Sequence, residues 1–382
     1  MMASEWKTVK LGELVSFKTG KLDSNAAVPD GDYPFFTCSQ ETLRTNTYSF
    51  DTECVLLGGN NANGIFPLKY FKGKFDAYQR TYVVKPSDPE QLTTKFLYYS
   101  LRPKLSELRS FSTGAATKFL TLTILNETAI EVPSLDEQQR IASILSAYDD
   151  LIENNLRRIR ILEEMARSLY REWFVQFRYS GHESVPLVDS PLGPIPQEWE
   201  VKTVENVLKR IPSGKKYDQK TASKTGSVPI FDQGKSGIIG YHDEEPGVDA
   251  TEDNPVIVFA NHTCYQRLIH FPFSAIQNVL PFVPNPSLPR NIYWLHWATD
   301  GLIAFNDYKG HWPEFVAKQL IVPTPEICHR FGEFASPTMR EILQLERAIE
   351  NLRRTRDLLL PRLLSGAVQL VAMKSELDEV KQ

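Results

Sequence analysis

Apolar residues recur in alternating steps of three and four along residues 136–177. Such spacing puts one narrow apolar stripe on a helix, and a narrow stripe is typical of a coiled-coil seam. No proline or glycine interrupts this segment, which at about 1.5 Å per residue would form a rod of roughly 60 Å. A long core helix is the alternative interpretation. The residues predicted to pack in the seam are Ile141, Leu145, Tyr148, Ile152, Asn155, Ile159, Leu162, Leu169 and Trp173.

The same pattern returns near the C-terminus, where the predicted seam residues are Ile342, Leu345, Ile349, Leu352 and Leu359. Residues 351–356 also repeat residues 155–160 with one difference, at an offset of 196. Pro361 should break or bend this second helix near its end, and Gly366 should terminate it. Two helices with one pattern predict an antiparallel pair that acts as a spacer.

The segments before each helix have the short periods of strands and turns. Residues 20–82 are rich in glycine, asparagine and aspartate, and β-branched or aromatic runs at 33–36, 54–57 and 81–84 have strand length. Residues 94–108 predict one helix, whose apolar face holds Phe96, Leu97, Tyr99 and Leu101. This segment is therefore expected to form a small mixed domain, mainly β.

The second segment repeats the order of the first. Residues 198–199 match 5–6, residues 228–231 match 33–36, and residues 273–277 match 75–79 at an offset of 198. Ordered weak matches along a whole segment are typical of a diverged duplication. We therefore predict an α+β fold, with two similar mixed, mainly β domains separated by two long antiparallel coiled-coil helices and related by a pseudo-two-fold axis. The predicted boundaries are 1–134 and 198–331 for the domains, 135–180 and 332–370 for the helices, 181–197 for a linker and 371–382 for a disordered tail.

Composition limits the function classes. The chain has 382 residues, a net charge of −4 and four cysteines without a CxxC pair. Scattered cysteines indicate reduced thiols, and no run resembles a membrane span or a secretion signal, so we expect a soluble cytoplasmic protein. The sequence also lacks phosphate-loop, dinucleotide, serine-hydrolase and HExxH motifs, which predicts a chain that does no chemistry.

Basic and amide side chains gather in particular parts of both segments. Between residues 60 and 120, ten lysines and arginines face four acidic residues, interleaved with asparagines, glutamines and aromatics. Lysine and arginine suit phosphates, while asparagine, glutamine and arginine can hydrogen-bond base edges. A solvated surface with ordinary turn residues is the competing interpretation. The candidate DNA-binding residues are Lys18, Lys21, Asn60, Asn61, Asn63, Lys69, Lys72, Lys74, Gln79, Arg80 and Lys118, then Lys215, Lys216, Gln233, Lys235, Asn261, Gln266, Arg267, Gln277, Lys309 and His311. Residues 262–264 lack a companion ligand pair, so we predict a turn there and no metal site.

Several motifs resemble one known family, the specificity subunits of type I restriction-modification systems. Residues 136–142 (DEQQRIA), 151–155 (LIENN) and 173–175 (WFV) look like its first conserved helical region, and residues 351–366 look like its second. Residues 193–199 (GPIPQEW) look like the usual entry into its second target-recognition domain. Residues 327–329 depart from the pattern, because Ile-Cys-His stands where the first repeat has Glu-Gln-Gln.

The resemblance implies a function that agrees with the residue patterns. Each domain would be a target-recognition domain that reads one half of a bipartite double-stranded DNA site, and the helices would set the spacer. Two modification subunits would supply S-adenosylmethionine, and restriction subunits would add ATP and magnesium, so no cofactor is expected in this chain. A coiled-coil scaffold whose two domains bind proteins is the alternative hypothesis, whereas the absent motifs disfavour a self-contained methyltransferase or nuclease.

Overall fold

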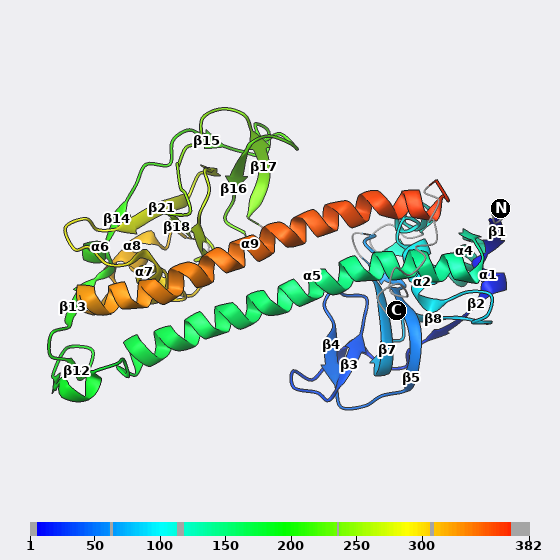
Figure 1. Cartoon of the computed structure of the whole chain (residues 1–382), viewed down its shortest axis with the longest axis horizontal. Coiled ribbons are helices and arrows are strands. Elements are labelled where there is room, and N and C mark those ends of the chain that lie inside the picture. Colours follow the sequence, from blue (N-terminus) through cyan, green and yellow to red (C-terminus); the bar gives the residue numbers. More distant parts are fainter. Residues whose placement is uncertain (1–5, 62–63, 113–117, 235–236, 306–308, 368–382) are drawn as a thin grey trace, which may run out of the picture. The chain divides into compact units, whose positions relative to one another are not determined.

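The computed structural model describes residues 6–61, 64–112, 118–234, 237–305 and 309–367. The chain forms two compact units, Met1–Asn154 with Ala348–Gln382, and Asn155–Arg347. Both boundaries fall inside long helices, α5 (Leu135–Tyr170) and α9 (Pro325–Leu364), so each unit holds one mixed domain and a part of each helix (Figure 1). Within the described residues, no helix combines the length and apolarity that crossing a bilayer requires.

The first unit is built on a six-stranded sheet with strand order β2-β8-β5-β7-β3-β4. Two-stranded ladders join β1 to β10 and β6 to β9. The strands are β1 (Lys7–Lys10), β2 (Val15–Thr19), β3 (Tyr33–Phe36), β4 (Leu43–Thr45), β5 (Phe50–Gly58), β6 (Asn60–Asn61), β7 (Leu68–Ala77), β8 (Thr81–Pro86), β9 (Lys118–Phe119) and β10 (Ala129–Val132). The helices are α1 (Leu11–Leu14), the 3-10 turn Ser24–Ala26, α2 (Thr94–Leu101), α3 (Leu105–Phe111) and α4 (Leu122–Glu127). The three strands expected at 33–36, 54–57 and 81–84 are therefore confirmed.

The helix expected at residues 94–108 is two helices. Helix α2 begins after Thr93, whose side chain caps the N–H of Phe96, and it ends before Pro103. Pro103 has no N–H to continue the helical bonds, so the chain turns before α3 begins. The predicted apolar face is correct, since Phe96, Leu97, Tyr99 and Leu101 are all buried in the core of this unit.

The second unit repeats this order with a divided sheet. Its strand orders are β14-β21-β18-β19 and β15-β20-β16-β17, with a β13-β22 ladder that corresponds to β1-β10. The strands are β11 (Leu187–Val188), β12 (Ile195–Pro196), β13 (Glu200–Thr203), β14 (Leu208–Arg210), β15 (Lys216–Tyr217), β16 (Val228–Phe231), β17 (Ile238–His242), β18 (Val256–Ala260), β19 (Gln266–Ile269), β20 (Ser274–Ile276), β21 (Val279–Pro284) and β22 (Gln319–Val322). The helices are the 3-10 turn His182–Ser184, α6 (Val204–Val207), α7 (Ile292–Thr299) and α8 (Trp312–Ala317).

One proline accounts for the difference between the two sheets. In the first unit, the single strand β7 pairs antiparallel with β5 and, at its end, parallel with β3. In the second unit the same two pairings belong to separate strands, β19 with β18 and β20 with β16. Pro272 lies between β19 and β20, and proline cannot donate the N–H that a continuous central strand needs.

The predicted seam of α5 faces the interior. Every seam residue predicted between Ile141 and Trp173 is buried or half-buried, whereas the off-seam residues Leu151, Ile161 and Met165 are about half exposed, at 48–53%. Helix α5 itself stops at Tyr170, and residues Arg171–Val175 form a π-helical turn instead of continuing it to residue 177. Phe174 in this turn packs against Phe331 of α9, with ring centroids 5.2 Å apart.

Helix α9 begins at Pro325, seven residues before the predicted start, and it passes through Pro361 to end at Leu364. Gly366 follows in the left-handed region, with φ of +67°, as the predicted stop requires. The N-terminal turns of the two long helices differ in one buried residue. In α5, Gln138 accepts from Thr93 N–H and donates to two carbonyls, whereas the corresponding Cys328 of α9 is buried among apolar side chains.

Candidate nucleic-acid interface

The turn between β7 and β8 brings several predicted residues of the first unit together. Gln79 donates its N–H to Leu22 (3.0 Å), and the carbonyl of Arg80 accepts from Gly59 (2.8 Å), which holds both ends of the turn. The Gln79 and Arg80 side chains are exposed, and the Arg80 guanidinium lies 5.5 Å from the centre of the Phe119 ring. A hollow of about 320 Å³ opens here, lined by Thr19, Gly59, Gln79, Arg80, Tyr82, Phe119 and Leu120.

In the short β6-β9 ladder, three more predicted residues lie next to Phe119, which lines this hollow. Asn60 pairs with Phe119, and Asn61 pairs with Lys118. The Asn60 side-chain oxygen is buried and has no hydrogen-bond partner among the described residues. Lys21 precedes the residue that bridges to Tyr78, so its backbone also lies beside the turn. The structure thus collects Lys21, Asn60, Asn61, Gln79, Arg80 and Lys118, which are separated by up to 97 residues in sequence.

Three other predicted lysines lie on β7 and have partners within the unit. Lys69 donates to the carbonyls of Ser39 and Glu41, at 3.3 and 2.9 Å, and burial lowers the pKa of its ammonium group. Lys72 pairs with Glu53 at 3.5 Å, and the Lys74 ammonium lies 4.7 Å from the Tyr48 ring centre. Lys18 is exposed on β2, and Asn63 lies outside the described residues. A DNA-binding role for these residues stays a prediction.

In the second unit, β15 and β20 form the corresponding site. Lys216 pairs with Ala275 and Tyr217 with Ile276 in a parallel ladder, and the exposed Gln277 follows directly. The Lys216 ammonium also donates to Ser213. A hollow of about 560 Å³ lies beside these residues, lined by Lys216, Tyr217, Asp218, Gln219, Thr221, Asp232, Ile239, Ile276 and Gln277.

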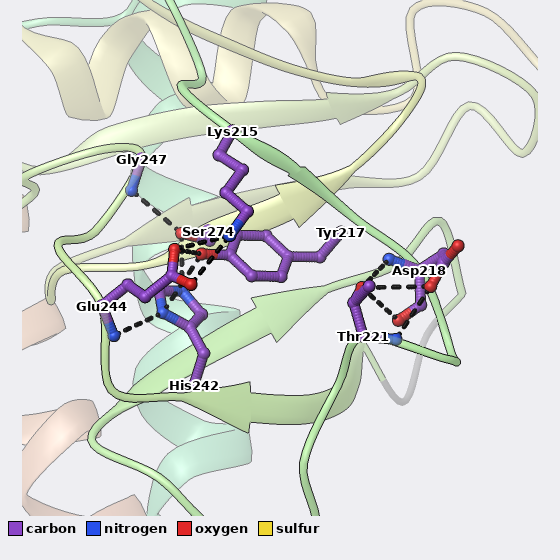
Figure 2. A network of polar contacts seen from close by, with 8 residues as sticks. All are labelled: Lys215, Tyr217, Asp218, Thr221, His242, Glu244, Gly247 and Ser274. Carbon is purple, nitrogen blue, oxygen red and sulfur yellow. Dashed lines mark hydrogen bonds and ion pairs between the residues drawn. The ribbon is translucent and has the colours of Figure 1, made fainter.

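A network of polar contacts holds Tyr217, which lines this hollow (Figure 2). The Tyr217 ring stacks on His242, with centroids 4.3 Å apart and an interplanar angle of 12°. Tyr217 donates its hydroxyl to Glu244 at 3.0 Å, and Lys215 donates to the same carboxylate at 2.7 and 2.8 Å. These hydrogen bonds lower the pKa of Glu244. His242 Nε2 lies 2.9 Å from the hydroxyl of Ser274, which is completely buried.

This serine, histidine and glutamate are arranged for support and not for catalysis. The backbone N–H of Glu244 donates to His242 Nδ1 at 3.1 Å, so the proton of a neutral imidazole lies on Nε2 and is donated to Ser274. A nucleophilic serine needs the opposite polarity, with Nε2 accepting the hydroxyl proton. Ser274 also accepts from the N–H of Gly247 at 2.9 Å, which ties the loop after β17 to β20. The sequence predicted only Lys215 of this network as a candidate site residue, because the members of the network are up to 59 residues apart and share no motif.

The turn after β15 is held by Asp218. Its carboxylate accepts from the N–H of Lys220 at 2.9 Å. It also accepts from the N–H of Thr221 at 2.9 Å and from the Thr221 hydroxyl at 3.0 Å (Figure 2). Its hydrogen bonds, chiefly those with Thr221, lower the pKa of Asp218. The backbone beside the hollow is therefore ordered by its own side chains.

The remaining predicted residues of this unit mostly support the fold. Gln266 is buried and donates to the carbonyl of His296 at 2.9 Å, and Asn261 accepts from Trp312 N–H at 2.7 Å. Gln233 accepts from the N–H of His262 at 2.8 Å, and His311 is completely buried. The guanidinium of Arg267 lies 5.5 Å from the ring centre of Phe231 and 4.9 Å from that of Tyr265. Lys309 is exposed, residues 262–264 form a turn as predicted, and Lys235 lies outside the described residues.

Comparison with known proteins gives consistent matches. The family described as type I restriction modification DNA specificity domain matches residues 3–164. The EcoDI specificity subunit of Escherichia coli is 37% identical over 177 residues, which are 46% of this chain and 38% of that protein. The MjaIX specificity subunit of Methanocaldococcus jannaschii is 27% identical over 304 residues, 73% of this chain and 70% of that protein. The match thus spans less than half the length of the EcoDI subunit.

The fold has a counterpart among solved structures. The crystal structure of a type I restriction-modification S subunit from M. genitalium aligns with a TM-score of 0.62. The alignment covers 94% of this chain and 96% of that one, with 18% sequence identity. At this level of identity the likeness concerns the fold alone.

Proposed function

Because the chain belongs to the family of type I restriction-modification specificity subunits, we propose that it is a DNA-recognition subunit that does no chemistry itself. Each unit reads one half of a bipartite site in double-stranded DNA, and the long helices set the spacer between the halves. Two modification subunits dock on this chain and bring S-adenosylmethionine. Restriction subunits, which use ATP and magnesium, join through that complex.

One observation supports DNA reading most directly. Each unit has an exposed glutamine at the end of a strand, beside a hollow with a lysine near it: Gln79 with Lys21 and Lys118, and Gln277 with Lys216. Lysine fits phosphate oxygens, and glutamine can hydrogen-bond either the backbone or a base edge. Repetition of this combination suits a protein that reads two half-sites.

Exposed apolar side chains support docking of a second protein. In the second unit, helix α5 exposes Leu156, Ile161 and Met165 by 39, 51 and 48%. Such side chains are favoured where another protein covers the surface. We assign this surface to a modification subunit. The alternative function, a scaffold whose two domains also bind proteins, would use the same helix surface without any DNA contact.

Adenine-methylation mapping tests the proposal. DNA from cells that carry this chain with its modification subunit should show a split motif, with two short defined halves around a fixed gap. Cells that lack only this chain should lose that motif. In vitro, affinity of the assembled complex for its site should fall steeply with salt, because phosphate contacts release counterions. An active modification subunit without a motif that depends on this chain would favour the protein-binding scaffold.

A further inference from the structure

Equivalent backbone hydrogen bonds in the two units show which residue of one unit corresponds to which residue of the other. In the first unit, Gly59 N–H donates to the carbonyl of Arg80 at 2.8 Å. In the second unit, Asn261 N–H donates to the carbonyl of Asn278 at 2.9 Å. Arg80 and Asn278 therefore occupy equivalent turn positions, and the residues before them, both glutamines, are equivalent too.

Two further pairings extend this alignment. The carbonyl of Gly59 accepts from Leu120, and the carbonyl of Asn261 accepts from His311, each at 2.9 Å. Counting back two residues makes Lys118 equivalent to Lys309.

The parallel bridges supply another equivalent pair. Leu22 bridges to Tyr78 in the first unit, and Tyr217 bridges to Ile276 in the second. Because Tyr78 and Ile276 each precede the turn glutamine, Leu22 corresponds to Tyr217. The residues before these two are Lys21 and Lys216.

The positions made equivalent by these hydrogen bonds and bridges divide into two sets. Three hold the same residue in both units: Lys21 and Lys216, Gln79 and Gln277, Lys118 and Lys309. The others differ, and among these are Asn60 against His262, Arg80 against Asn278, and Phe119 against Gly310. The half-sites of a bipartite target share their sugar-phosphate backbone but differ in their bases.

The residues that differ between the two units also have different surroundings and backbone conformations. Arg80 is exposed and lies over the ring of Phe119, a contact that restricts its rotamers and leaves its nitrogens open. In the second unit the turn residue Asn278 has a φ of +67°, and Gly310 has no ring to offer. A side chain on Gly310 would come within 2.9 Å of the Asn261 amide. At these equivalent positions, therefore, the first unit has an arginine-aromatic pair and the second unit has none.

We infer that the residues shared by the two units position the DNA backbone, and that Arg80 is a specificity-determining residue which reads a base in one half-site only. This inference rests on the proposed function and adds to it which residues contact the DNA backbone and which residue reads a base. An arginine fork makes two hydrogen bonds to guanine, the commonest specific contact in the major groove. Lysines make contacts to phosphate that are independent of sequence. In the second unit, Asn278 and His262 take the place of this reader, which gives that unit a different preference.

The test uses the assembled modification complex with three kinds of variant. Arg80→Lys keeps the charge but loses the fork, so it should relax base preference at one position of one half-site by roughly tenfold or more while the salt dependence stays unchanged. Asn278→Gly removes the side chain but tolerates the positive φ, and it should alter the other half-site only. Lys21→Ala should weaken binding to all sequences, reduce the slope of log affinity against log salt by about one, and leave the motif intact.

Two results separate the inference from the proposed function. The first is that the wild-type complex methylates a split motif that Arg80→Lys leaves unchanged. That result would overturn the assignment of Arg80 and leave the proposed function in place. A shift of the motif by Lys21→Ala would overturn the division between shared and differing residues. An active complex whose methylation shows no split motif would contradict both.

Discussion

Replacing Asp149 with alanine is expected to lower the free energy of unfolding by about 3 kcal/mol, because it leaves a buried arginine without its main partner. Asp149 of α5 forms an ion pair with Arg356 of α9, and the side chains are 28 and 11% exposed. It also accepts from the Tyr99 hydroxyl at 2.8 Å and lies 3.6 Å from the Arg102 guanidinium. The pKa of Arg356 is nevertheless raised, since its carboxylate neighbours outweigh the opposing effect of burial. One residue thus joins the domain of the first unit to both long helices.

Urea unfolding followed by circular dichroism would measure this loss. A matched control is Glu341→Ala, which removes an ion pair with Arg158 between the same two helices. Those side chains are 40 and 52% exposed, so the loss should stay within about 0.5 kcal/mol. The double change of Asp149 and Arg356 to leucine should recover part of the stability, because it removes the unpaired charge of Arg356, whereas Arg102 still loses its carboxylate partner. Equal losses from Asp149→Ala and Glu341→Ala would contradict the prediction.

The second unit should lose stability between pH 6.5 and 4 because of two histidines. Burial lowers the pKa of both His270 and His296 to about 4. For His270, Glu252 acts against this shift and Arg347 adds to it. The folded-state pKa lies below the unfolded value of about 6.5, so the unfolded chain gains protons first as the pH falls. Each histidine should therefore contribute about 2 kcal/mol less stability at pH 5 than at pH 7.

His270→Phe isolates this effect. The His270 ring is 2% exposed, neither nitrogen has a partner among the described residues, and it stacks beside Tyr293 with centroids 6.3 Å apart. A phenyl ring keeps the stacking and removes both the unpaired nitrogens and the titration. The variant should gain about 1 kcal/mol at neutral pH and more at pH 5. His329→Gln, at a side chain that is 78% exposed, should change neither value. Parallel pH curves for wild type and His270→Phe would contradict the prediction.

Periodicity was informative wherever local spacing sets the structure. Steps of three and four place Ile141 and Leu145 on one face of any helix, so their burial in a seam followed from the sequence. The strand β3 also occurs at its predicted residues, because a short β-branched or aromatic run between turns favours a strand. Where local signals conflicted, prediction was less accurate. Pro103 divided one predicted helix, whereas Pro361 did not end another.

The hydrogen-bond partners of the polar side chains could be identified only from the tertiary structure. The sequence showed that Lys69 and Gln79 are polar residues in the same basic segment, but not that Lys69 is held by the carbonyls of residues 39 and 41. Nor could it show that Tyr217, His242 and Ser274 meet, since hydrogen bonds between distant segments leave no periodic trace.

The sequence by itself thus determined the duplication, the two long helices and the family resemblance, all of which depend on residue order and spacing. Only the tertiary structure decided which polar residues lie near each hollow and which form hydrogen bonds or ion pairs elsewhere in the fold. The physical reason is that a side chain's role depends on its partners, and strand register brings those partners together from distant parts of the chain.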